Sequence, residues 1–467
     1  MFTDTWGRLR RRLADVVPGR SPDRPVPGPV ADGPELVRTL ADRADRLHRE
    51  GKPDLAAESL AEAVALGRDV TGADWGDALT QLADALSRAA RADEAVATAR
   101  AAVAAFGDQR SAGRAEALRR LGRHLLSVGN SDEAVVVVRE AAELYASLAG
   151  PLAVRHGKAL FMAQYELAMA LGVVGRYEEA ITAATQPLLT LRIQDRLHVA
   201  RGRRHYADLL FRVASWQGEL DRPAEAVENA RPAVAQLRRV VATDALDDDL
   251  DKLAHVLVVL ARQLRRLDRD IEAVPPLREA VALWQRLPDG DNDLAKSSIE
   301  LSRLYRDLGG HDDAALAAQQ TAVDAGRRLV AVDAEYYEGR LAASLLALAE
   351  RARAAGSTPD ALPACDEAVS IARRLVQYAA FAPAPERQWC EGLLLGGLTE
   401  LACLHAEGGR RTEAVDTMAE LDGLAAGLIL DADQRDWVDS TYAFVREVAP
   451  DECDRRGLPG SSGAVED

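Results

Sequence analysis

The sequence predicts an all-α protein, a right-handed α-solenoid of about nine helix–turn–helix repeats. The first observation is an alanine that recurs at one place in a repeated phrase, at intervals of 39 to 53 residues that average about 45. Self-similarity at such a period is typical of stacked repeats, in which each repeat buries its apolar face against its neighbours. The recurring alanines are Ala56, Ala95, Ala134, Ala180, Ala226, Ala273, Ala314, Ala361 and Ala414.

The second observation is the composition of each repeat, which the fourth repeat, residues 161–192, illustrates. Its first segment places apolar residues at helical spacing, and Gly175 then marks a helix end, where glycine adopts the left-handed conformation at little cost. Glu178 and Glu179 begin the next helix, where the helix dipole favours negative charge. Ala180 and Ala184 follow four residues apart and leave room for a partner helix.

The third observation is a small residue twelve positions before each recurring alanine, on the first helix of the repeat. These small residues are Ala44, Ala83, Gly122, Ala168, Ala214, Ala261, Ser302, Ala349 and Ala402. Together with the turn glycine and the alanines of the second helix, they resemble the tetratricopeptide repeat (TPR) family over roughly residues 34–428. The long period is similar to that of kinesin-light-chain-type and bacterial peptide-sensor repeats. The resemblance implies a superhelix whose first helices line a concave face.

The chain ends differ from the repeats. Residues 1–17 predict a basic amphipathic helix, residues 18–33 a proline-rich linker, and residues 34–430 the solenoid. A C-terminal capping helix is expected over 431–448 and a disordered tail over 449–467. The first segment fits contact with a membrane or a partner, or folding back onto the solenoid.

Composition narrows the function. The net charge of −16 argues against a general nucleic-acid binder, which needs a basic surface. The four cysteines show no paired spacing, and no apolar run reaches membrane-spanning length, so a reducing cytoplasm is the expected location. Lysine is rare among the basic residues, which suggests a GC-rich bacterial genome. No catalytic, metal-binding or cofactor-binding motif is found, so we expect no enzyme activity, no metal and no cofactor.

The resemblance implies candidate ligand-facing residues on the first helices. Because guanidinium groups bind carboxylates and phosphates through paired hydrogen bonds, the arginines among them favour an acidic peptide with one or two apolar anchors. The alternative is that these arginines neutralise carboxylates on adjacent helices. The candidate peptide-binding residues are Arg119, Arg123, Met162, Tyr165, Met169, Phe211, His255, Arg262, Arg265, Arg303, Arg306 and Arg353.

The leading functional hypothesis is therefore a non-enzymatic scaffold that binds a protein or peptide segment in its concave groove. Two alternatives remain open at this stage. One is a regulatory sensor whose superhelix tightens when a ligand enters. The other is a membrane-surface adaptor tethered through residues 1–17.

Overall fold

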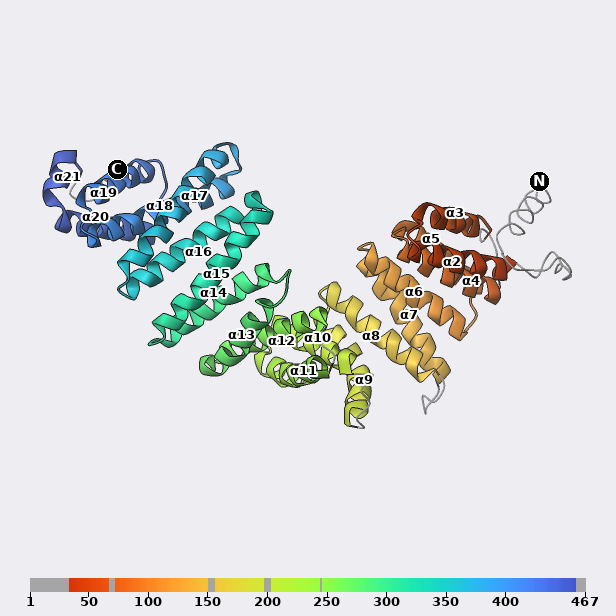
Figure 1. Cartoon of the computed structure of the whole chain (residues 1–467). Coiled ribbons are helices and arrows are strands. Elements are labelled where there is room, and N and C mark those ends of the chain that lie inside the picture. The colour runs from red at the N-terminus through yellow and green to blue at the C-terminus, as the bar shows by residue number, and fades with distance from the viewer. Residues whose placement is uncertain (1–32, 67–71, 150–155, 197–202, 244–245, 459–467) are drawn as a thin grey trace. The chain divides into compact units, whose positions relative to one another are not determined.

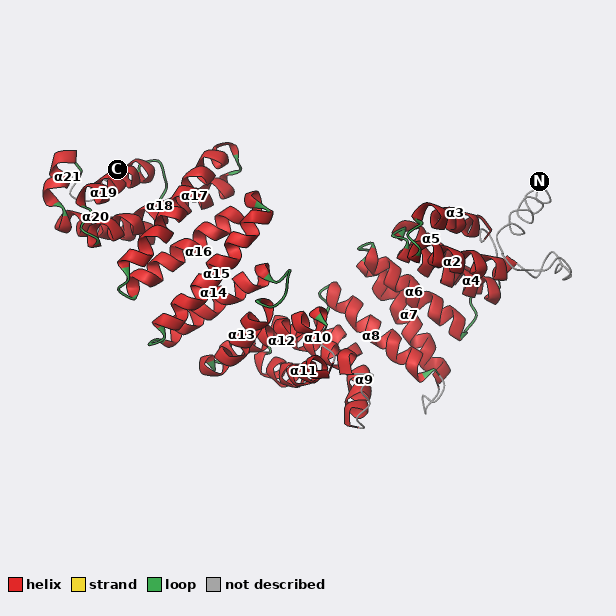
Figure 2. Cartoon of the chain, in the orientation of Figure 1, coloured by secondary structure: helices red, strands yellow, loops and turns green. Residues whose placement is uncertain are grey.

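The computed structural model describes residues 33–66, 72–149, 156–196, 203–243 and 246–458 (Figure 1). The expected helix over 1–17 and most of the linker over 18–33 lie outside these ranges. The described residues form α-helices and one short 3-10 helix, without any strand (Figure 2). None of the described helices combines the length and apolar composition that a transmembrane segment requires.

The helices follow one another as nine consecutive pairs and two terminal helices. In chain order they are α2 (Gly33–Arg49), α3 (Pro53–Leu66), α4 (Ala73–Arg88), α5 (Ala92–Phe106), α6 (Ala112–Ser127), α7 (Ser131–Ala149), α8 (Gly157–Val173), α9 (Tyr177–Arg196), α10 (Arg203–Glu219), α11 (Pro223–Thr243), α12 (Asp247–Arg265), α13 (Asp270–Trp284), α14 (Asp291–Leu308), α15 (Asp312–Val332), α16 (Ala334–Ala354), α17 (Thr358–Tyr378), η2 (Ala379–Phe381), α18 (Ala384–Glu407), α19 (Arg411–Ala425), α20 (Ala432–Val448) and α21 (Pro450–Arg456). The first helix of each pair, from α2 to α18, carries an even number and is called an A helix below, and the second is a B helix.

The turn inside each pair contains a residue with a positive φ. The residue that closes the A helix has a positive φ in all nine turns, as the glycine pattern predicts. Asp221 and Asp268 adopt it where the glycine is replaced, with φ of 58° and 56°, and so does Ala90, with φ of 58°. The other six positions are Gly51, Gly129, Gly175, Gly310, Gly356 and Gly409.

The small residues and recurring alanines lie where the helices of a pair meet. All nine small residues of the A helices are buried, and so are eight of the nine predicted B-helix alanines. Gly122 shows why size matters, because a Cβ there would lie 2.1 Å from a Val138 methyl. Small side chains thus let the two helices of each pair approach closely.

The seventh repeat departs from the predicted register. Ala315 is the buried residue there, 3% exposed, and Ala314 is only half-buried. The turn contains two glycines with positive φ, Gly309 and Gly310, which add one residue. The spacing from Ser302 is therefore thirteen residues, and the Ser302 hydroxyl donates to the Ala315 carbonyl at 2.7 Å.

The chain divides within α9 into two compact units. The N-terminal unit runs to Pro187 and the C-terminal unit begins at Leu188. In the C-terminal unit, α14, α15 and α16 lie side by side (Figure 1). One apolar core of this unit extends from α15 to α21.

The helix α20 packs against α18 and α19 of the last repeat. Asp431 and Gln434 form a reciprocal capping box at its start, and Val438, Tyr442 and Val445 are buried against the core. The tail expected to be disordered from residue 449 instead begins with α21. Its Cys453 is 3% exposed and joins the same core, and this burial of an otherwise polar helix explains the difference.

Candidate functional site

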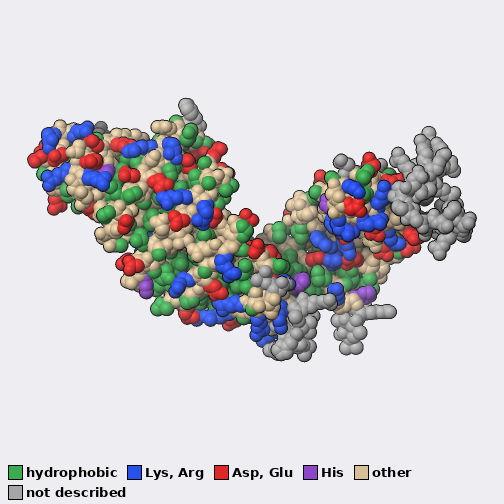
Figure 3. Space-filling view, viewed as in Figure 1, with side chains coloured by type: hydrophobic (Ala, Val, Ile, Leu, Met, Phe, Trp, Pro, Cys, Tyr) green, Lys and Arg blue, Asp and Glu red, His purple; other side chains and the backbone are tan. Residues whose placement is uncertain are grey.

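The predicted peptide-binding residues divide between the two units. Arg119, Arg123, Met162, Tyr165 and Met169 lie in the N-terminal unit and the others in the C-terminal unit. Each group is therefore considered within its own unit. On the face shown in Figure 3, basic and acidic side chains are interspersed over both units.

Arg119 on α6 is held by carboxylates of its own and the next A helix. Its guanidinium donates to Glu116 at 2.7 Å and forms a second ion pair with Glu166 on α8. Burial lowers the pKa of Arg119, but the hydrogen bond that Arg119 donates to Glu116 and the charges of Glu166 and Glu116 together outweigh burial and raise it overall. Tyr145 also hydrogen-bonds Glu116, at 3.1 Å. This guanidinium is part of the scaffold between α6, α7 and α8.

Arg123 lies beside a buried histidine. The His124 side chain is 4% exposed, and its Nε2 lies 3.3 Å from the Asp84 carboxylate on α4, which also pairs with Arg120. Burial, followed by the charges of Arg123 and Arg120, lowers the pKa of His124 to about 4. His124 is thus neutral near pH 7, while Arg123 itself is exposed.

The three predicted apolar anchors of this unit, Met162, Tyr165 and Met169, are half-buried along α8. Tyr165 stacks on Phe161 with ring centroids 6.3 Å apart. These side chains present an apolar stripe on an A helix.

In the C-terminal unit, three predicted arginines pair with carboxylates of the next A helix. Arg262 pairs with Glu300 at 2.6 Å, Arg265 with Asp307 at 2.8 Å, and Arg353 with Glu400 at 2.6 Å. Arg265 and Arg353 each have a second carboxylate partner, Asp270 and Glu407. Burial lowers the pKa of Arg353, but the hydrogen bond to Glu400, the charge of Glu400 and the hydrogen bond to Glu407 together outweigh burial and raise the pKa. Each of these carboxylates accepts hydrogen bonds from a guanidinium group, which therefore has fewer N–H donors available for a ligand.

The remaining candidates of this unit differ in setting. Phe211 is half-buried, with the Arg212 guanidinium 6.0 Å from its ring centroid. His255 lies 3.4 Å from Asp251 and packs edge-on against Trp284. Arg306 is exposed and lies 3.3 Å from Asp307, which it shares with Arg265.

Arg303 lines a cavity of about 390 Å³ between α14 and α16, with α15 at its base. We call this cavity the basic pocket. Four cations and no carboxylate line it: Lys296, Arg303, Arg340 and Arg351. Its apolar wall includes Ile299, Leu329, Leu341 and Ala347, and Trp389 reaches it from α18.

The cations of the basic pocket are only partly satisfied. Arg303 is exposed and makes no hydrogen bond or ion pair with any described residue. Arg351 donates to the Ser302 hydroxyl at 2.6 Å and to no carboxylate among the described residues. Burial, and then the charges of Arg306 and Arg303, lower the pKa of Arg351. The lining of the pocket therefore concentrates positive charge, and among its four cations only Lys296 forms an ion pair with a described residue, Asp293 at 3.7 Å.

A buried amide adds a directional group to the pocket. Gln319 on α15 is fully buried, and its Nε2 donates to the Ser344 carbonyl at 2.9 Å. Because this bond fixes the orientation of the amide, Oε1 is left as an acceptor without a partner in the described part of the chain.

One position explains why Arg303 is unpaired when Arg262 is not. Both arginines directly follow the small residue of their A helix, and Glu300, the partner of Arg262, lies two residues before the next small residue. Glu166 and Glu400 occupy the same position on α8 and α18. On α16 the residue at this position is Ala347, which lines the basic pocket instead of supplying a carboxylate.

Arg303 is the one residue of the pocket lining that is also among the predicted peptide-binding residues. Arg340, Tyr337 and Trp389 lie early on α16 and α18, more than two turns before the small residue, because these helices have 21 and 24 residues. Arg351 lies only two residues after the small residue Ala349, and the TPR resemblance assigns no ligand contact there. The sequence did carry one signal for the pocket: Ala347 stands at the position where α8, α14 and α18 carry a glutamate.

The acidic segment Asp289–Glu300 begins α14. Asp291 pairs with Arg328 of α15 at 2.6 Å. Among the described residues, no group of three or more His, Cys, Asp or Glu side chains could hold a metal ion. All four cysteines are free, and Cys365, Cys390 and Cys453 are buried.

The fold and site together define a repeat protein built of TPR-like helix pairs. No family profile matches the chain, and no curated protein is similar to it. Among solved structures, it is similar to a Podosopora anserina protein with nearly identical TPR-like repeats, at 20% identity over 46% of this chain and 100% of that chain, TM-score 0.38. It is also similar to the apo form of RapI, at 11% identity over 63% and 98%, TM-score 0.40. A Rap protein complexed with competence and sporulation factor matches at 13% identity over 79% and 99%, TM-score 0.36. All three TM-scores lie below 0.5.

Proposed function

We propose that this protein is a non-enzymatic interaction scaffold that binds an acidic peptide or protein segment between α14 and α16. The observation that carries the proposal is the basic pocket, in which four cations surround an apolar wall without a carboxylate. In a chain of net charge −16, such a concentration of positive charge is selective for an acidic partner.

Electrostatics favours a carboxylate in this pocket. Arg303, Arg306 and Arg351 repel one another, and that repulsion is part of what lowers the pKa of Arg351. A carboxylate from a partner would relieve the repulsion and accept hydrogen bonds from Arg303. Hydrogen bonds to charged groups contribute on the order of 1.5–3 kcal/mol each.

The wall of the pocket favours an apolar group beside the carboxylate. Ile299 and Leu329 are half-buried, and the buried Leu341 lines the same pocket. Covering such surface contributes roughly 25 cal/mol per Å². A glutamate or aspartate next to a leucine-like side chain would satisfy both parts of the pocket, and a backbone N–H could donate to Gln319 Oε1.

A selection from a display library of random twelve-residue peptides tests the proposal. We expect the wild-type protein to enrich peptides that carry Asp or Glu beside an apolar residue. The Arg303→Glu variant should bind the recovered peptides about tenfold more weakly or worse, because it replaces attraction by repulsion. Arg303 makes no contact that folding requires, so this variant should fold normally.

The matched control is Arg278→Glu on α13, since Arg278 is also exposed and forms no ion pair within the described residues. It makes the same change in net charge away from the pocket and should bind within twofold of wild type. Recovery of peptides without acidic residues, or equal binding by the Arg303→Glu variant, would show that the pocket is not the binding site.

A further inference from the structure

A second hollow adjoins the basic pocket and shares two of its residues, Arg340 and Trp389. It measures about 540 Å³ and is formed by the first turns of α16 and α18 and the end of α17. We call it the aromatic hollow. Its principal lining residues are Glu335, Tyr336, Leu375, Tyr378, Glu386 and Trp389.

The aromatic hollow gathers exposed rings in a chain that has few aromatics. Aromatic residues make up 4% of the sequence, yet Tyr336, Tyr378 and Trp389 lie here with 57%, 77% and 51% of their surface exposed. The Trp389 indole lies across Gly339 of α16, where a Cβ would come within 2.5 Å of the ring. Exposed Tyr and Trp side chains are characteristic of binding surfaces.

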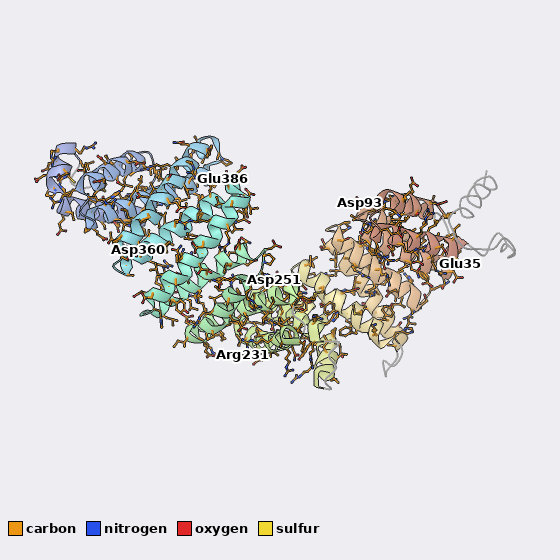
Figure 4. All side chains as sticks on the ribbon, viewed as in Figure 1. Glu35, Asp93, Arg231, Asp251, Asp360 and Glu386 are labelled. Atoms are coloured by element: carbon orange, nitrogen blue, oxygen red, sulfur yellow. The ribbon has the colours of Figure 1, made fainter. Side chains whose placement is uncertain are left out.

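The charge of this hollow differs from that of the basic pocket. Glu335 and Glu386 are both exposed, and neither forms an ion pair or side-chain hydrogen bond within the described ranges. Each lies in the first turn of its helix, where the helix dipole stabilises a carboxylate without a partner. Figure 4 labels Glu386 at the start of α18.

The rings of the hollow already accept one guanidinium group. Arg340 lies 4.7 Å from the centroid of Tyr336, and its Nη2 donates to the Tyr336 hydroxyl at 3.0 Å. The outer rings, Tyr378 and Trp389, have no such cation over them among the described residues. Aromatic faces attract cations, and arginine both stacks on a ring and pairs with a carboxylate through a planar fork.

We propose that the aromatic hollow binds an arginine side chain of the same segment whose carboxylate enters the basic pocket. This inference rests on the proposed function, since it concerns the same ligand. The guanidinium would stack on Tyr378 or Trp389 and pair with Glu335 and Glu386. Because the two cavities share Arg340 and Trp389, the acid and the arginine of the partner lie only a few residues apart in sequence. The favoured partner therefore carries both charges, in a fixed order.

The test uses fluorescein-labelled peptides recovered from the display selection. Each peptide is also made with its arginine replaced by citrulline, which keeps the shape but removes the charge, and with its acid replaced by the amide. We expect the citrulline peptide to bind wild type at least fivefold more weakly. In the double variant Glu335→Gln, Glu386→Gln the difference between the arginine and citrulline peptides should shrink to what stacking on the rings contributes, and this change in the difference measures the pairing as a double-mutant cycle.

The outcomes separate this inference from the proposed function. If the acid-to-amide change weakens binding but the citrulline change does not, the acidic scaffold stands and the arginine site is wrong. The same conclusion follows if the citrulline effect is undiminished in the Gln variant, or if the peptides carry an apolar residue in place of arginine. If the amide change has no effect, the proposed function itself fails. Circular dichroism melting of the Gln variant verifies folding, which we expect to be unchanged because both carboxylates are unpaired.

Discussion

Individual positions decide whether a charged side chain of this protein serves the scaffold or a ligand. Arg262 and Arg303 occupy the same place in their A helices, yet Arg262 pairs with Glu300, and the corresponding position opposite Arg303 is Ala347. An exposed arginine that is paired to a neighbouring helix has less to gain from a partner protein. The absence of one carboxylate thus separates a candidate binding residue from a structural one.

A single residue also marks a weak point in the repeat. Ala90 has a left-handed backbone, with φ of 58°, at a position where six of the nine turns have glycine. The turn is otherwise regular, since Arg91 N–H donates to the Leu86 carbonyl at 3.0 Å, as Asn130 N–H donates to Leu125. The left-handed conformation costs an L-residue roughly 1–2 kcal/mol relative to glycine.

We therefore predict that Ala90→Gly stabilises the α4–α5 pair by about 1 kcal/mol, after the greater freedom of glycine in the unfolded chain is subtracted. Hydrogen exchange of the α4 and α5 amides should slow by about fivefold. The reciprocal change Gly129→Ala should accelerate exchange in α6 and α7 by a similar factor. No change in either pair would mean that these turns relax without cost.

At the scale of helices, ion pairs connect many neighbouring repeats, some between A helices and some between B helices. The A helices are linked by pairs such as Arg353–Glu400, and the B helices by exposed pairs such as Arg373–Glu420. The two kinds differ in burial, because the Glu400 side chain is 3% exposed and that of Glu420 is 40% exposed. Buried partners leave an uncompensated charge when one is removed, whereas exposed pairs contribute little.

We expect Glu400→Gln to lower the free energy of unfolding by about 1–2 kcal/mol, since Arg353 would lose its buried carboxylate partner and keep only the more exposed Glu407. Glu420→Gln, which makes the same chemical change on the B face, should cost less than about 1 kcal/mol. Urea unfolding followed by circular dichroism compares them. Equal destabilisation by both variants would contradict the proposed distinction between the two faces.

The sequence predicted the helix pairs well because their signals are local. The turn conformation, the small A-helix residues and the B-helix alanines each follow from the spacing of a few residues, and the structure confirms them. The register failed at Ala314, because the second glycine of the turn adds a residue that only the hydrogen bonding of Ala315 reveals. The candidate site was harder to predict. Arg340 and Trp389 come together only because α16 and α18 begin more than two turns before the small residues that recur at a fixed distance from the turn of each repeat.

At the scale of the whole molecule, net charge is a poor guide to the binding surface. The chain carries −16, but many of its acidic side chains are used in pairs between helices, and the basic pocket has none in its lining. A repeat architecture permits this contrast, because each pair can change its own surface while its neighbours keep the stack together. The seventh and eighth pairs illustrate this, because their helices α14, α15 and α16 form most of the basic pocket.

The most direct test of the central claim restores the missing carboxylate. In Ala347→Glu, the introduced acid should pair with Arg303 as Glu300 pairs with Arg262, and so occupy the site from within. Isothermal titration with an acidic peptide from the selection should show affinity reduced by about tenfold or more. Ala317→Glu, an exposed position on α15 outside the pocket lining, should bind like wild type. Undiminished binding by the Ala347→Glu variant would contradict the account.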